Sequence, residues 1–80
     1  MMEYHIIVEK LDSTQGKNRY FHLFCAKLIG LYTGKRAYDE IKANFPEPEY
    51  RVTLEIWEYS GKEVDADAFF AKKSALQELA

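Results

Sequence analysis

The sequence predicts a small α+β protein. We expect an antiparallel sheet of three to four strands that carries two helices on one face, in the order ββ(β)αβα. Two segments show the β-branched composition or the two-residue alternation of strands. Two further segments space their apolar residues as a helix does, behind a capping residue. The 80 residues suffice for one domain, so we treat residues 1–80 as a single unit.

The first two expected strands form a hairpin. Residues 3–11, EYHIIVEKL, are rich in β-branched side chains and contain neither Gly nor Pro. Residues 12–18, DSTQGKN, are polar or turn-forming, and we expect an exposed loop there. Residues 19–24 then return as the second strand.

The segment 19–33, RYFHLFCAKLIGLYT, fits two structures. As a helix, it gathers most of its large apolar residues on one wide face. As β structure, it forms strands over residues 19–24 and 28–33, joined by a tight turn at residues 25–27. The aromatic and β-branched composition and the interior Gly30 favour β structure, which we expect here.

Two helices complete the expected fold. Thr33 caps the first, over residues 34–45, and Pro46 ends it. Its apolar stripe comprises Ala37, Tyr38, Ile41 and Phe45. The turn Ser60-Gly61-Lys62 leads to the second helix, over roughly residues 66–79, which Asp65 or Asp67 caps. There we expect a partly exposed Phe70, and a core face made of Phe69, Leu76 and Ala80.

The strand expected over residues 50–59, YRVTLEIWEY, carries the main indication of function. Its core face holds Val52, Leu54 and Ile56, and its opposite face holds Trp and Arg, which are enriched at contact surfaces. We therefore predict a partner-binding surface there, joined by two residues of the expected loop: Arg51, Glu55, Trp57, Tyr59, Gln15 and Lys17. The alternatives are that the aromatic side chains pack across the sheet, or that a helix covers this face.

Charge is unevenly distributed along the chain. Net charge is −2; residues 1–45 hold seven Lys and Arg against five Asp and Glu, and residues 46–80 hold four against eight. The overall acidity disfavours general nucleic-acid binding, which needs a concentrated basic face. Basic residues interleaved with aromatics in the first half keep a nucleic-acid-binding module as the alternative function, acting through Arg19, Lys27, Lys35 and Arg36.

No motif predicts catalysis, a metal site or a cofactor. The hairpin register expected from the loop places His5 opposite Cys25, which would pair a thiol with a base. No third orienting group or oxyanion motif accompanies them, and a lone cysteine in an apolar stretch is usually a small core residue. Two histidines and one cysteine match no zinc spacing. We therefore expect no enzymatic activity, no metal and no cofactor.

The lone cysteine, the lack of a secretion signal and the lack of an apolar run of ~18 residues predict a cytoplasmic protein that does not enter membranes. One compact domain without chemistry and with asymmetric charge predicts a non-enzymatic regulator or inhibitor. We expect it to occupy a surface of a larger protein, a profile that suits a phage-encoded inhibitor of a host system. Open sheet faces or edges would also permit a homodimer.

Overall fold

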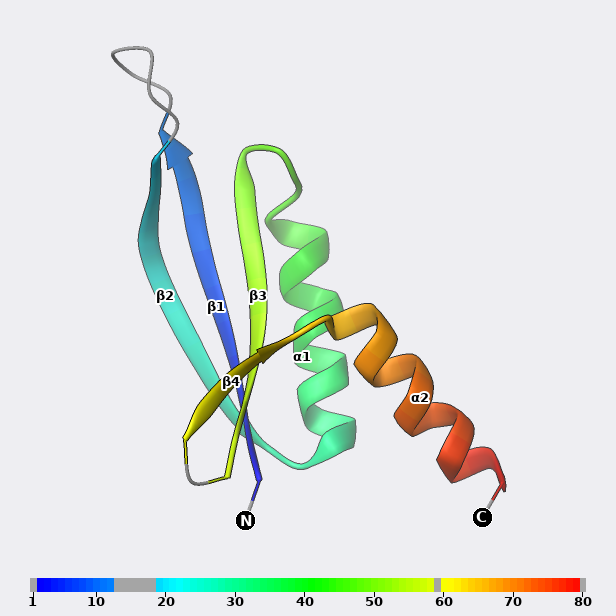
Figure 1. Cartoon of the computed structure of the whole chain (residues 1–80). Helices are drawn as coiled ribbons and strands as arrows, with labels where there is room; N and C mark the ends of the chain where they lie inside the picture. The colour runs from blue at the N-terminus through cyan, green and yellow to red at the C-terminus, as the bar shows by residue number, and fades with distance from the viewer. Residues whose placement is uncertain (1, 13–18, 59, 80) are drawn as a thin grey trace.

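The protein is described by a computed structural model, which covers residues 2–12, 19–58 and 60–79, with side chains as far as residue 72. Its elements are β1 (Glu3–Asp12), β2 (Arg19–Ile29), α1 (Leu31–Asn44), β3 (Tyr50–Trp57), β4 (Gly61–Val64) and α2 (Ala66–Leu79). Both helices lie on one side of the sheet (Figure 1). The predicted α+β class is confirmed.

The sheet is antiparallel throughout and has the strand order β2-β1-β3-β4. The long strands β1 and β3 therefore lie in the centre, and β2 and β4 form the two edges. The edges differ greatly, because β2 has 11 residues and β4 has four.

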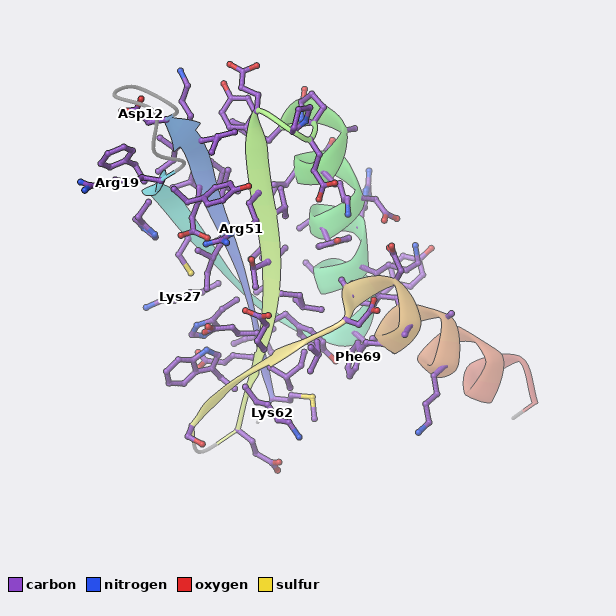
Figure 2. All side chains as sticks on the ribbon, turned by 45° about the horizontal axis from the view of Figure 1, so that its top comes forward. Asp12, Arg19, Lys27, Arg51, Lys62 and Phe69 are labelled. Atoms are coloured by element: carbon purple, nitrogen blue, oxygen red, sulfur yellow. The ribbon has the colours of Figure 1, made fainter. Side chains whose placement is uncertain are left out.

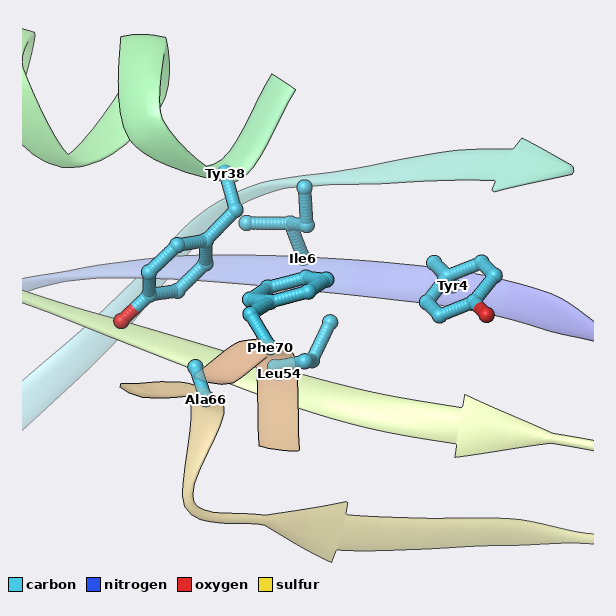
Figure 3. Packing of buried hydrophobic residues seen from close by; sticks show 6 residues of the cluster. All are labelled: Tyr4, Ile6, Tyr38, Leu54, Ala66 and Phe70. Atoms are coloured by element: carbon cyan, nitrogen blue, oxygen red, sulfur yellow. The ribbon is translucent and has the colours of Figure 1, made fainter. Parts of the chain in front are cut away.

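The core lies between the two central strands and the helices (Figure 3). Ile6 of β1 stands opposite Leu54 of β3, and both side chains are fully buried. Tyr38 of α1 and Phe70 of α2 close over them, as Figure 3 shows. The predicted core face of β3 is confirmed, since Leu54 is buried and Val52 and Ile56 pack against the same cluster.

The segment 19–33 differs in detail from the expected β structure. β2 runs unbroken to Ile29, so the turn expected at residues 25–27 and the strand expected over residues 28–33 are wrong. Leu23 has no partner on β1, because the register shifts between Val8 and Glu9. This bulge moves the following side chains to the other face of the sheet. The alternation is therefore broken, which is why the sequence pattern fitted no single regular strand.

The first helix begins three residues earlier than a Thr33 cap implies. Gly30 is the residue before α1, and its φ of 95° allows the chain to turn abruptly from β2 into the helix. Gly34 lies inside α1 and lets the helix approach β1, because a Cβ there would stand 2.8 Å from Cγ of Tyr4. Three residues of the expected apolar stripe are confirmed, since Tyr38 is buried and Ala37 and Ile41 pack against the core. The fourth, Phe45, follows the last residue of α1 and packs against Phe24 and Tyr50 instead.

The second helix begins as predicted, at Ala66. The backbone N–H of Ala68 donates a hydrogen bond of 3.2 Å to Oδ1 of Asp65, which is the capping contact. Phe69 packs against the core as expected, but the partial exposure expected for Phe70 is wrong, because Phe70 is the more deeply buried of the two. Phe70 lies against Tyr4 and Tyr38, with ring centroids 6.5 and 5.6 Å away.

Two smaller expectations near α2 have different outcomes. Gly61 and Lys62 were expected in a turn, but they belong to β4. Leu76 and Ala80, expected in the core, lie outside the side chains that the structure describes.

Candidate interaction surface

The face of the sheet turned away from the helices, which we call the open face, holds the strand residues predicted to bind a partner. Arg51, Glu55 and Trp57 of β3 lie on it, because they alternate with the buried residues of that strand. The other three predicted residues, Tyr59, Gln15 and Lys17, lie outside the described residues.

Trp57 lies flat across the open face. Its ring is stacked on His5 of β1, with centroids 4.8 Å apart, and its indole N–H donates a hydrogen bond of 3.0 Å to Oε1 of Glu55. On the other side, Gly61 stands opposite Trp57, and a Cβ at Gly61 would collide with the indole. The indole is therefore fixed by contacts across the sheet, so Trp57 forms a half-buried platform.

Arg51 connects three strands. Its Nη2 and Nε lie 2.8 and 2.9 Å from Oε1 of Glu9 on β1, and its guanidinium stands 4.0 Å above the ring of Tyr20 on β2. A depression of about 290 Å³ lies beside this contact, lined by Ile7, Glu9, Arg51, Thr53, Glu55 and Glu63. Three of the six lining residues are acidic and one is basic, so the centre of the open face favours polar or cationic groups.

The expected pairing of Cys25 with His5 is wrong. Cys25 stands opposite Ile7, and His5 stands opposite Lys27. Next to the loop the register already differs by one position from the one expected, and the bulge adds a second position. His5 is buried under the Trp57 ring, and its Nε2 lies 3.5 Å from Oε2 of Glu3. Within the described residues, no group of three or more His, Cys, Asp or Glu side chains could hold a metal ion.

The largest apolar exposure of the described residues lies on and just after β2. Among the side chains that the structure describes, the large hydrophobic ones that are substantially exposed all fall between positions 20 and 32, with exposed fractions from 37% at Phe24 to 83% at Tyr32. We call the exposed hydrophobic side chains of the strand itself the β2 surface: Tyr20, Phe21, Leu23, Phe24 and Ile29. These side chains lie along one strand and on both of its faces, and such a concentration of exposed large apolar side chains is typical of an interaction site.

Position at the edge of the sheet explains this exposure. β2 pairs only with β1, so its outer side has no neighbouring strand. The bulge places apolar residues on both faces: Phe24 stands opposite Val8 on the helix side, and Tyr20 stands opposite Leu11 on the open side. Only part of this surface is covered, for instance where Phe24 meets Phe45 of α1 at 5.4 Å.

The β2 surface was not predicted from the sequence. The signal that could have identified it is an 11-residue segment rich in large apolar residues without regular alternation. Both helices lie on one side of the sheet and only partly cover β2 there, and its open face carries no helix.

The basic residues of the nucleic-acid alternative lie on two elements. Arg19 and Lys27 belong to β2, whereas Lys35 and Arg36 lie near the start of α1. Lys35 is already paired with Asp39 at 2.7 Å. A depression of about 400 Å³ on α1 is lined by Tyr32, Lys35, Arg36 and Asp39. The basic residues are thus not gathered into one continuous groove of a single element.

Comparisons with protein-family models, with curated proteins and with solved structures found no match for this chain. In the part of the chain that the structure describes, neither helix is long and apolar enough to cross a membrane.

Proposed function

We propose that the protein is a non-enzymatic binding protein that occupies a surface of a larger protein and thereby regulates or inhibits it. The observation that carries this proposal is the β2 surface, where five large apolar side chains of one edge strand are exposed. Aromatic residues are enriched at protein–protein contacts, and three of these five are aromatic.

The exposed apolar area of the β2 surface is the source of binding free energy in this proposal. Removing exposed apolar surface from water contributes about 25 cal/mol per Å², although the net affinity is reduced by the costs of association. The polar residues of the open face adjoin β2 through the contact of Arg51 with Tyr20. They fit the rim of such an interface, which excludes water around the apolar centre. In this proposal Trp57 and Glu55 contribute to that rim.

The proposal places the protein in the cytoplasm. Cys25 is the chain's only cysteine, so the chain forms no internal disulfide, which fits a compartment in which thiols stay reduced. A small phage-encoded inhibitor of a host protein is one form that such a binding protein takes.

The test is affinity capture from a lysate of the source organism. Wild type is compared with Phe21→Ser/Leu23→Ser, and with the control Ala43→Ser/Asn44→Ser, which changes two exposed residues of α1. We expect one protein captured in stoichiometric amount by wild type and control, lost with the β2 variant, and unaffected by nuclease. Equal capture by all three proteins, or no stoichiometric partner, would contradict the proposal.

The second candidate function is binding of single-stranded nucleic acid. The specific observation in its favour is that Arg19 and Lys27 flank exposed aromatic side chains on β2, since bases stack on such rings. Against it, four carboxylates on the open face repel phosphates: Glu3 and Glu9 on the neighbouring strand β1, Glu55 on β3 and Glu63 on β4. Retention of oligonucleotides at ~50 mM salt, falling steeply as salt rises, would favour this candidate.

A further inference from the structure

We propose that the partner binds by strand addition. An extended segment of the partner pairs with the free edge of β2, and it carries two acidic side chains that face Arg19 and Lys27. This inference rests on the proposed function and specifies which part of the partner is recognised.

The two edges of the sheet are unequally protected. Natural proteins protect sheet edges by keeping the edge strand short, by covering it, or by placing charged side chains and bulges on it. β4 has four residues, whereas β2 has 11 residues and, within the described residues, no strand on its outer side. The protection that β2 does carry is a bulge and two cations, Arg19 and Lys27, which repel a basic strand and leave the edge open to an acidic one. A long open edge supplies the row of backbone donors and acceptors that an added strand needs, and the exposed side chains beside it supply apolar contacts. β2 is therefore the edge suited to strand addition.

Charge on β2 determines the chemistry of the added strand. The strand contains Arg19 and Lys27 and no acidic residue. Figure 2 shows both side chains at the outer side of the sheet, directed away from β1. Neither forms an ion pair within the described residues. An added strand with carboxylates opposite these two cations satisfies them.

The same charges disfavour a second copy of this chain. Antiparallel pairing of β2 with itself about Leu23 would set Arg19 opposite Lys27 of the other copy. Other registers bring no carboxylate to either cation, because β2 has none. Like charges that stand opposite each other in a sheet are destabilising. The occupant is therefore a segment of another protein.

The bulge at Leu23 fixes the spacing of the two acids. Arg19 and Lys27 are eight positions apart on β2, but their partners on β1, Asp12 and His5, are seven apart. A regular strand added on the outer side of β2 would pair with the same bulged strand as β1 does, so its two acidic residues should also stand seven positions apart. Residues seven apart on a strand point to opposite faces. This matches Arg19, which lies opposite Asp12 on the helix side, and Lys27, which lies opposite His5 on the open face.

The test uses the ¹⁵N-labelled full chain and synthetic peptides. The first probe is TEVTVTVTET, whose glutamates stand seven positions apart, like Asp12 and His5 on β1. The second replaces both glutamates with lysine. Two further forms of the acidic peptide are N-methylated, one at its odd-numbered residues and the other at its even-numbered residues. Each form lacks the N–H donors along one edge of the strand and keeps all its side chains. The readouts are amide shifts, amide exchange on β2 and the dissociation constant.

We expect the acidic peptide to protect amides of β2 and to bind about tenfold more tightly than the lysine peptide at low salt. One of the two N-methylated forms should lose binding. Arg19→Glu/Lys27→Glu should reverse the peptide preference, whereas Lys72→Glu, which changes an exposed lysine of α2, should keep it. Circular dichroism confirms that each variant is folded.

Three peptide results would overturn strand addition: binding of neither peptide at millimolar concentration, equal binding of both, or retained binding by both N-methylated forms. A wild-type dimer in sedimentation, with the β2 amides protected from exchange in the absence of peptide, would overturn it as well. These results are separable from failure of the proposed function, because the peptides require no natural partner. Capture of a partner through β2 together with failure of the peptides would leave the proposed function standing and remove strand addition.

Discussion

Trp57 is held by three neighbours at once. His5 is stacked on one side of the ring, Glu55 accepts its N–H, and Gly61 leaves the space in which the indole lies. An aromatic side chain that lies over a glycine of the neighbouring strand covers backbone that would otherwise be exposed. The residue that first indicated a contact surface thus also stabilises the sheet that carries it.

Gly61→Ala tests this packing. The added Cβ would overlap the indole, so Trp57 must move away from β4 and from His5. Overpacking of this kind costs about 1–3 kcal/mol of the free energy of unfolding. Urea denaturation gives the stability, and near-ultraviolet circular dichroism reports the ring. Ser60→Ala, at the exposed neighbouring position, is the control. Unchanged stability and an unchanged near-ultraviolet spectrum in Gly61→Ala would show that the indole does not lie over Gly61.

Tyr4 gives the protein a sensitivity to alkaline pH. Burial raises the pKa of its hydroxyl above the ordinary value of 10.0. The folded protein therefore retains this proton at pH values where the unfolded chain has lost it. The contribution is fully present below pH 10 and is lost as the pH rises through the folded pKa. Lys42 acts in the same direction, since its hydrogen bond to the Tyr38 hydroxyl raises the pKa of its ammonium group.

Tyr4→Phe should make the free energy of unfolding less dependent on pH above 10. The variant keeps the ring and lacks the hydroxyl that must ionise. The measurement is urea denaturation from pH 8 to 11 for both proteins. The difference between wild type and variant should be constant at the lower pH values and should change above pH 10. Parallel curves over the whole range would mean that Tyr4 does not retain its proton.

At the scale of elements, α2 depends on its first turns. Asp65 caps the helix, and Ala66 and Phe70 belong to the buried core. In Figure 1 the second half of α2 runs away from the sheet. The Asp65 cap and the Phe70 contact are thus close together, so unwinding of the first turn of α2 should also weaken the core.

Asp65→Ala should lower the free energy of unfolding by about 1 kcal/mol, because the N–H of Ala68 loses its acceptor. Asp65→Asn is the matched control, since an amide oxygen caps nearly as well. Thermal denaturation followed by far-ultraviolet circular dichroism measures both. An alanine variant as stable as the asparagine variant would argue against the capping contact.

The elements differ in how far their sequences determined them. β1 and β3 were predictable because their apolar residues alternate and point to one core. β2 was not, because the bulge at Leu23 and the glycine at position 30 depend on how the strand pairs and where α1 must pack. Phe69 and Phe70 are adjacent on a helix, so only the angle at which α2 meets the sheet decides which is buried.

For the whole molecule, the helices cover one face of the sheet, and the other face and the β2 edge remain uncovered. An 80-residue chain has a small core, and its stability is expected at the lower end of the ~5–15 kcal/mol typical of domains. The face that Trp57 and Arg51 occupy was predicted correctly, because strand alternation fixes which side of the sheet each side chain takes. The β2 surface was missed, because exposure at an edge depends on strand order, which the sequence pattern does not encode.

The central claim is that β2 contacts a partner protein. Site-specific photo-cross-linking in cells tests it most directly, with a benzoylphenylalanine placed singly at Leu23 on β2, at Glu63 on the open face, or at Ala43 on α1, all of which are exposed. The account predicts one heterologous cross-linked protein from position 23, weaker cross-linking to the same protein from position 63, and none from position 43. Cross-linking from position 43 equal to that from position 23, or none from position 23, would contradict it.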